Sequence, residues 1–311
     1  MAEVFGGLWL ENLVAQDKHF VLQCDLFEKG LIQGIQLRVA HSSFTPGVTA
    51  EMIPEILDRL PEGLKLVLHF GAESNGVDFG ENLDEWGEFL QRSNGSSWQE
   101  WNEQSVAWGF EVAAAARKRI PEKFPWGIVH AGYGKSFDDF KSKARILDAL
   151  KKNLNKMAIE NVPPIADKNF YVDPEETKYW SREKYWGFGG TPVNMDYLLR
   201  SLGAGWRCLI DFTHLFVMVF QARVLGASIL ERCKHLDSVV GAYLDLPHWP
   251  VCHFSGIPPT LTDNHDFLPV KPPESIREAI GQMEAVCLEI LWKPQTAEKD
   301  IESFRENYRI F

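Results

Sequence analysis

Short apolar runs alternate with longer amphipathic stretches along the chain, and eight of these runs have the length and composition of buried strands. They cover Glu3 to Leu10, Gly34 to Val39, Leu64 to Phe70, Trp126 to His130, Met157 to Glu160, Arg207 to Asp211, Pro250 to Phe254 and Ala285 to Leu291. The first is the least defined of the eight, because His19 to Asp25 has a competing strand-like pattern.

Helix-like segments lie between the predicted strands. They cover Ala50 to Leu60, Trp98 to Arg119, Phe137 to Asn153, Asn194 to Leu202, Leu215 to Cys233, Pro273 to Met283 and, at the end, Asp300 to Arg305. Start signals for three of them are Ser136, Thr191-Pro192 and Pro272-Pro273. Eight alternating units in 311 residues predict an α/β fold, a single (β/α)8 TIM barrel over residues 1–311 with long loops at its C-terminal rim.

In five of the predicted strands a short apolar run ends in a side chain that commonly binds metals: His69, His130, Glu160, Asp211 and Glu289. The carboxyl ends of barrel strands meet at one rim, which is where barrel enzymes place their active sites. The pattern therefore predicts that these five side chains face a common pocket.

Further histidines and carboxylates fall at the same predicted rim. His214 follows Asp211 by three residues at a strand-to-loop junction, His253 lies in the seventh strand, and Asp263-Asn264-His265 follows in the next loop. A lone histidine at a strand end is more often a core residue, but five of the nine histidines lie at this rim with four carboxylates. Nitrogen and oxygen ligands without thiolates suit zinc, manganese or iron(II), and carboxylates can bridge two metals.

Two long loops leave this rim, and loops of such length are usually functional or disordered. One is Gly71 to Ser97. The other is an insertion at about 161–190 that is rich in aromatic residues, and its Tyr185 and Trp186 are candidate substrate contacts. The aromatic loop either forms a lid or stacking wall over the metal site or packs onto the barrel.

Composition limits the partners and the compartment. The formal net charge of −11 provides no basic surface for nucleic acid, and no uncharged apolar run approaches the length of a membrane span. The five cysteines are odd in number and lack paired spacing, as in a reduced, cytoplasmic protein. No protein partner is identifiable.

At the rim residues the chain resembles the endonuclease IV family (AP endonuclease family 2) within the xylose-isomerase-like TIM barrels. That family binds three zinc ions with nine ligands, and the resemblance implies a counterpart for each. It implies a first site at His69, His130 and the bridging Glu160, and a second at Glu160, Asp211, His253 and Glu289. It implies a third site at His214, Asp263 and His265, in which Asp263-Asn264-His265 is similar to the Asp-Arg-His of the family.

The departures from the family concern its substrate. The family has a tyrosine three residues after the first histidine, where this chain has Ala72, and the basic recognition loop is replaced by residues 40–44, without Lys or Arg. Where the family has the sequence motif Glu-Asn-Thr-Ala-Gly, this chain has Glu160-Asn161-Val162-Pro163-Pro164. A small phosphorylated or sugar-like substrate is therefore favoured over damaged DNA.

Two enzyme classes and one alternative follow from these residues. The first is a metal-dependent phosphoester hydrolase with up to three metal ions, in which Glu160 and Glu289 are the catalytic carboxylates. The second is a sugar isomerase or epimerase that uses one metal at Glu160, Asp211, His253 and Glu289, with Glu160 or Glu289 moving a proton. The third is a non-catalytic barrel that has kept a metal. The larger ligand set favours the hydrolase.

Two remaining signals are weaker. Gly132-Tyr133-Gly134-Lys135-Ser136 resembles the end of a P-loop but lacks its first glycine, since that position is Val129. Lys135 either contacts a substrate phosphate or lies beside a helix capped by Ser136. His41 is expected to be solvated.

Overall fold

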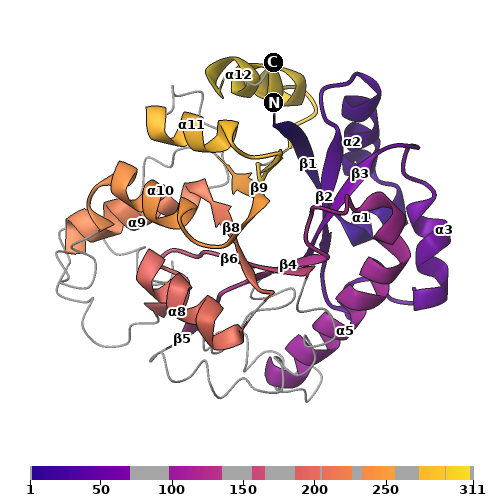
Figure 1. Ribbon diagram of the computed structural model, residues 1–311. Helices are drawn as coiled ribbons and strands as arrows, with labels where there is room; N and C mark the ends of the chain where they lie inside the picture. Colours follow the sequence, from indigo (N-terminus) through magenta and orange to yellow (C-terminus); the bar gives the residue numbers. More distant parts are fainter. Residues whose placement is uncertain are drawn as a thin grey trace.

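Eight parallel strands close into a barrel, and the helices surround it (Figure 1). The computed structural model of the protein describes residues 2–70, 98–134, 156–164, 186–203, 205–225, 233–255, 273–290 and 292–308. Around the barrel the strands are β1 (Glu3–Trp9), β2 (Gly34–Val39), β3 (Lys65–Phe70), β4 (Gly127–His130), β6 (Met157–Glu160), β8 (Arg207–Asp211), β9 (His248–Phe254) and β10 (Ala285–Leu288). The predicted barrel class is confirmed.

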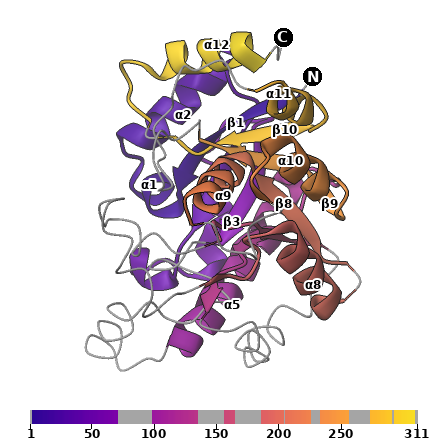
Figure 2. The same ribbon diagram turned by 90° about the vertical axis from the view of Figure 1, so that its left-hand side faces the viewer.

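The outer layer consists of helices that pack on the outside of the strands (Figures 1 and 2). The α-helices are α1 (Leu10–Ala15), α2 (Lys18–Glu28), α3 (Ile53–Leu57), α5 (Trp98–Ala116), α8 (Pro192–Leu202), α9 (Phe212–Leu225), α10 (Leu236–Leu244), α11 (Glu274–Gly281) and α12 (Ala297–Tyr308). Single turns of 3-10 helix are η1 (Ser42–Phe44), η2 (Ala50–Met52) and η3 (Arg117–Arg119). In both views α12 and α11 lie near the start of β1.

All eight predicted strands are present, with ends that differ by a few residues. Their near-continuous apolar sequences reflect burial on both faces, by the barrel interior and by the helices. In β6, for example, all four residues are buried, and in β4 the first three are.

Three local features differ from the predicted scheme or were not part of it. The segment His19 to Asp25 is helical, because Asp17 caps α2 by accepting hydrogen bonds from the backbone of His19 and Phe20, and its apolar residues recur at helical spacing. Helix α9 begins at Phe212, directly after β8, where a loop was expected. Helix α10 was not predicted, because its Val-Val-Gly sequence has weak helix propensity and only packing decides its state.

The start of α8 follows the predicted signal. The side chain of Thr191 accepts a hydrogen bond from the backbone N–H of Asn194 at 3.1 Å, and Pro192 occupies the first helical turn. The predicted helix Phe137 to Asn153, with its start signal Ser136, lies outside the described residues.

Phe70, at the end of β3, fills the space between the barrel and α5. Its ring is fully buried and lies so close to two glycines that a Cβ added at Gly127 would be 2.5 Å from it and one added at Gly109 would be 2.7 Å from it. Phe110 meets the same ring edge-on, at 5.6 Å between centroids. The position of His69, one residue earlier, therefore depends on this packing.

A short antiparallel ribbon joins two segments that follow different barrel strands. It pairs β5 (Tyr133–Gly134), after β4, with β7 (Trp186–Gly187), after β6. The backbone N–H of Phe188 extends the contact by donating to the carbonyl of Gly132 at 2.9 Å, and the Phe188 side chain is buried. At its described end, the aromatic insertion thus packs onto the barrel.

The five cysteines are free thiols, as expected from their spacing. Among the described residues, no helix combines the length and the apolar character needed to cross a membrane.

Candidate metal centre

The six ligand-type side chains at the strand ends lie at one rim because the strand register aligns them. His130 at the end of β4 is the register partner of Glu160 at the end of β6, and Asp211 at the end of β8 is the partner of His253 in β9. His69 is the penultimate residue of β3, and Glu289 directly follows β10.

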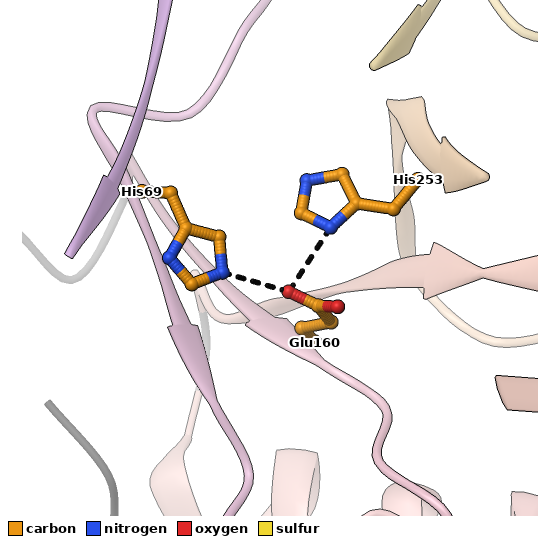
Figure 3. Close-up of side chains that lie close together, drawn as sticks. All are labelled: His69, Glu160 and His253. Atoms are coloured by element: carbon orange, nitrogen blue, oxygen red, sulfur yellow. Dashed lines mark hydrogen bonds and ion pairs between the residues drawn. The ribbon is translucent and has the colours of Figure 1, made fainter. Parts of the chain in front are cut away.

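Glu160 lies at the centre of the cluster. One of its carboxylate oxygens, Oε2, lies 2.9 Å from Nε2 of His69 and 3.1 Å from Nδ1 of His253 (Figure 3). The same oxygen lies 3.5 Å from Nε2 of His130. Three imidazoles from three different strands thus converge on a single carboxylate oxygen.

Two further carboxylates adjoin Glu160 on the side of β8 and β10. Ligand atoms of Glu160, Asp211, His253 and Glu289 all lie within 4.8 Å of one another, and so do those of His69, Glu160 and His253. Glu160 and His253 belong to both groups. The arrangement therefore offers two adjoining sets of donors that share a carboxylate.

His214 reaches the cluster from the first turn of α9 rather than from a loop. Its Nε2 lies 3.5 Å from Oδ2 of Asp211, and its Nδ1 lies 3.8 Å from Oε1 of Glu160 and 2.6 Å from the backbone oxygen of Asn161. Since the backbone carbonyl of Asn161 accepts a hydrogen bond from Nδ1–H, Nε2 is the nitrogen that faces Asp211.

The donor set suits a divalent cation. Glu160, Asp211 and Glu289 are at most 7% exposed, and buried carboxylates that face one another are unfavourable without compensating positive charge. Two buried atoms, Oε1 of Glu160 and Nδ1 of His69, have no hydrogen-bond partner among the described residues. Nitrogen and oxygen donors in this number fit zinc, manganese or iron(II).

Charge within the metal-free cluster is shared between Glu160 and His253. Burial alone would raise the pKa of Glu160, but the charges of His253 and His130 and the hydrogen bonds of His253 and His69 hold that pKa well below its usual value. Burial alone would lower the pKa of His253, but Glu160 and Glu289 raise that pKa well above its usual value. A metal bound by His253 would therefore have to displace a proton from it.

The other two imidazoles favour the neutral form. Burial lowers the pKa of His69, and it lowers the pKa of His130 from 6.5 to about 4, although Glu160 opposes both changes. Neutral imidazole is the form that binds metal ions.

We expect the metal-free protein to lose stability as pH falls from about 6.5 to about 4. In this window the unfolded chain protonates His130 while the folded protein does not, so the free energy of unfolding should fall by about 3 kcal/mol over the window. His69 acts in the same direction. His253 does not contribute to this loss of stability. Its raised pKa keeps it protonated in the folded protein, and between pH 6.5 and 4 it is protonated in the unfolded chain as well, so its effect on stability falls at higher pH.

Urea unfolding of the EDTA-treated protein at several pH values measures this slope. In His130→Gln the decrease should be smaller, because one of the two histidines is gone. An identical slope in this variant would contradict the assignment to His130.

Asn161 joins the ends of β6 and β8 beneath the cluster. Its side-chain amide donates to the backbone oxygen of Asp211 at 3.1 Å and accepts from the backbone N–H of Asp211 at 2.6 Å. The Asp211 carboxylate is further held by the backbone N–H of Thr213, which donates to Oδ1 at 2.6 Å. Asn161 thereby fixes the residue that carries a candidate ligand.

Replacing Asn161 with alanine should destabilise the protein by roughly 2–4 kcal/mol, since two buried backbone groups of Asp211 lose their partners. Chemical denaturation measures the change, with Asn307→Ala on α12 as the control. The Asn307 amide donates a long hydrogen bond to the Ser303 hydroxyl, at 3.4 Å, so the control should change stability by less than about 0.5 kcal/mol. Equal losses in the two variants would contradict a special role for Asn161.

Two residues of this centre were missed by sequence reasoning. Gln36 and Arg38 of β2 both donate to Oε1 of Glu289, at 2.9 and 2.6 Å. The sequence does contain a signal for them: Gln36 and Arg38 are polar residues at alternate positions of an otherwise apolar strand, which places both on the same face of that strand.

Several predicted site residues lie outside the description of the cluster. Asp263, His265, Lys135 and Tyr185 fall outside the described residues, and for Trp186 only the backbone is described. The third predicted metal site is therefore represented by His214 alone, and these roles stay predictions.

His41, expected to be solvated, is instead 7% exposed. Its ring stacks on Trp101 at 3.7 Å between centroids, and its Nε2 lies 2.8 Å from the side-chain oxygen of Gln104. Burial lowers the pKa of His41. It serves to attach α5 to the segment after β2.

Comparisons with known proteins identify the fold but no family. No protein-family model matches the chain, and no curated protein does. The "Putative Xylose isomerase" from Rhodospirillum rubrum is similar in structure, with a TM-score of 0.55 and 11% identity over 100% of this chain and 99% of that one. The TTHB071 protein from Thermus thermophilus, solved after soaking with ZnCl2, has a TM-score of 0.51 and 14% identity over 98% of each chain. The comparisons thus support the TIM-barrel fold alone, and the resemblance to endonuclease IV stays a prediction.

Proposed function

We propose that the protein is a metal-dependent hydrolase that cleaves a phosphoester bond at a multinuclear, zinc-type centre. The observation that carries this proposal is the convergence of more donors than one metal needs. His69 and His130 meet Glu160 from one side, and Asp211, His253 and Glu289 adjoin it from the other. A single ion would be satisfied by four of them.

Metals bound here would supply positive charge for a phosphoryl oxygen and a water of lowered pKa. The side chains of the protein would perform the remaining tasks. Glu160, whose lowered pKa keeps it ionised, would be shared between the two donor sets. Glu289, held by Gln36 and Arg38, would keep a fixed orientation at the edge of the centre.

The substrate we propose is a small phosphorylated molecule rather than DNA. The chain carries a net charge of −11, and the segment after β2 that would correspond to a recognition loop has no Lys or Arg. DNA binding depends on neutralising phosphates with basic side chains. Damaged DNA therefore remains the weaker candidate.

A second candidate function is a sugar isomerase or epimerase. The specific observation in its favour is that Glu160, Asp211, His253 and Glu289 alone form a complete four-ligand set. In that case Glu160 or Glu289 would transfer a proton at the carbon next to a carbonyl group.

Metal content and activity together separate the two candidates. Elemental analysis of the purified protein should find two or three divalent ions per chain, and zinc is the first to test because the similar TTHB071 structure was obtained with ZnCl2. A chelator should abolish hydrolysis of bis(4-nitrophenyl) phosphate. One ion per chain, without hydrolysis but with interconversion of aldose and ketose sugars, would overturn the hydrolase and favour the isomerase.

A further inference from the structure

A cavity of about 310 Å³ opens beside the metal centre, between the ends of β1, β2 and β10. Among the residues that line it are Trp9, Asn12, His19, Arg38, Glu289 and Trp292. Glu289 belongs both to this wall and to the candidate metal ligands, so the cavity adjoins the centre at this residue. Its volume is at the lower end of the range for ligand pockets, which suits a single small group.

Arg38 is held in a defined position on this wall. Its side chain is 26% exposed, one of its nitrogens donates to Oε1 of Glu289 at 2.6 Å, and its guanidinium lies 5.5 Å from the centre of the Trp9 ring. Trp9 and Arg38 are register partners on neighbouring strands. A guanidinium fixed in this way by an aromatic ring is suited to binding planar or tetrahedral oxyanions.

The charges on the described wall of the cavity depend on the metal centre. Arg38 and Glu289 are its only fully charged side chains among the described residues, and they neutralise each other. A metal bound by Glu289 would draw the carboxylate charge toward itself and weaken the interaction of Glu289 with Arg38. The remaining charge of the cavity would then be positive.

We propose that this cavity binds an oxyanion group of the substrate, a phosphate or a carboxylate, through Arg38. The inference deepens the proposed function and rests on it for the placement of substrate beside the metals. It adds that the substrate carries an acidic group apart from the bond that reacts, and that occupation of the metal centre strengthens binding of this group.

Neutralising Glu289 imitates the effect of the metal on Arg38 and can be tested without any metal. The probe is methylphosphonate, an oxyanion without an ester bond, titrated calorimetrically into protein from which metals and EDTA have been removed. Glu289→Gln should bind the probe at least about tenfold more tightly than the unchanged protein, and adding Arg38→Met should reverse this gain.

Two matched controls accompany the test. Glu284→Gln removes a carboxylate just before β10, at the opposite end of the barrel, where it pairs with Lys123. Arg207→Met, at the start of β8, removes a guanidinium that also lies over a tryptophan, 5.1 Å from the ring centre of Trp249 in β9. Neither should change methylphosphonate affinity.

Three outcomes would overturn the proposal: no saturable binding by any variant, an equal affinity in Glu289→Gln and the unchanged protein, or a gain that survives Arg38→Met. Circular dichroism of each variant verifies that it is folded, and Arg38→Lys, which keeps the charge, should retain part of the affinity. Because the probe cannot be hydrolysed and no metal is present, the result is independent of whether the hydrolase assignment is correct.

Discussion

Replacing Glu160 with glutamine should remove most of the bound metal and reduce turnover of a phosphodiester by about a thousandfold or more. Glu160 is the one carboxylate shared by both donor sets, with its Oε2 2.9 Å from His69 and 3.1 Å from His253. Glutamine keeps the shape of the side chain but removes its charge, so the histidines and carboxylates around it lose the group that joins them. Elemental analysis after dialysis and a phosphodiesterase assay measure the two effects.

The control for this experiment is Glu3→Gln, at the start of β1. Glu3 pairs with Lys65 at the opposite end of the barrel, so the same chemical change there should leave metal content and turnover intact. Thermal unfolding of both variants after EDTA treatment verifies that the fold is retained. Full metal occupancy in Glu160→Gln would show that Glu160 does not bridge the two donor sets.

Phe70→Ala should produce the largest loss of stability among single changes near the centre, about 3–5 kcal/mol. The ring is fully buried, and two of its neighbours are Gly109 and Gly127, which have no side chains to move into the space left behind. The cavity therefore stays open, and this is the condition under which large-to-small substitutions are most damaging. Because His69 precedes Phe70, metal affinity should also fall.

Urea unfolding of the metal-free protein measures this effect without a contribution from metal binding. Phe70→Leu, which fills more of the space, should lose less stability than Phe70→Ala. Phe220→Ala removes a phenylalanine that is 41% exposed on α9, and it should change stability by less than about 0.5 kcal/mol. A loss in Phe70→Ala no greater than in Phe220→Ala would contradict the packing argument.

The strands could be predicted because burial on both faces leaves a simple mark on the sequence. A run such as Met157 to Ile159 is apolar regardless of where it lies in the barrel, and the ligand that follows it marks the rim. The convergence of His69, His130 and Glu160 could then be expected from fold geometry alone, because parallel strands present their carboxyl ends together.

The features that were missed depend on contacts between distant segments. Nothing local to His41 indicates that Trp101 covers it, and nothing in the sequence of α10 distinguishes it from a strand. The role of Arg38 required the knowledge that β2 and β10 flank the same strand, β1, which places Arg38 beside Glu289. Such pairings are properties of the closed barrel.

The seam of the barrel has a consequence for the order of assembly. The first strand closes the sheet by pairing with the last, Glu3 beside Ala285, so the joining segments are separated by nearly the whole chain. Contacts between such distant segments form slowly during folding. Gln36 and Arg38 of β2 reach Glu289, which stands directly after the last strand, only when the seam has closed. The orientation of this candidate ligand is therefore completed only when the two ends of the chain have met, although the other ligands lie on strands that pair without the seam.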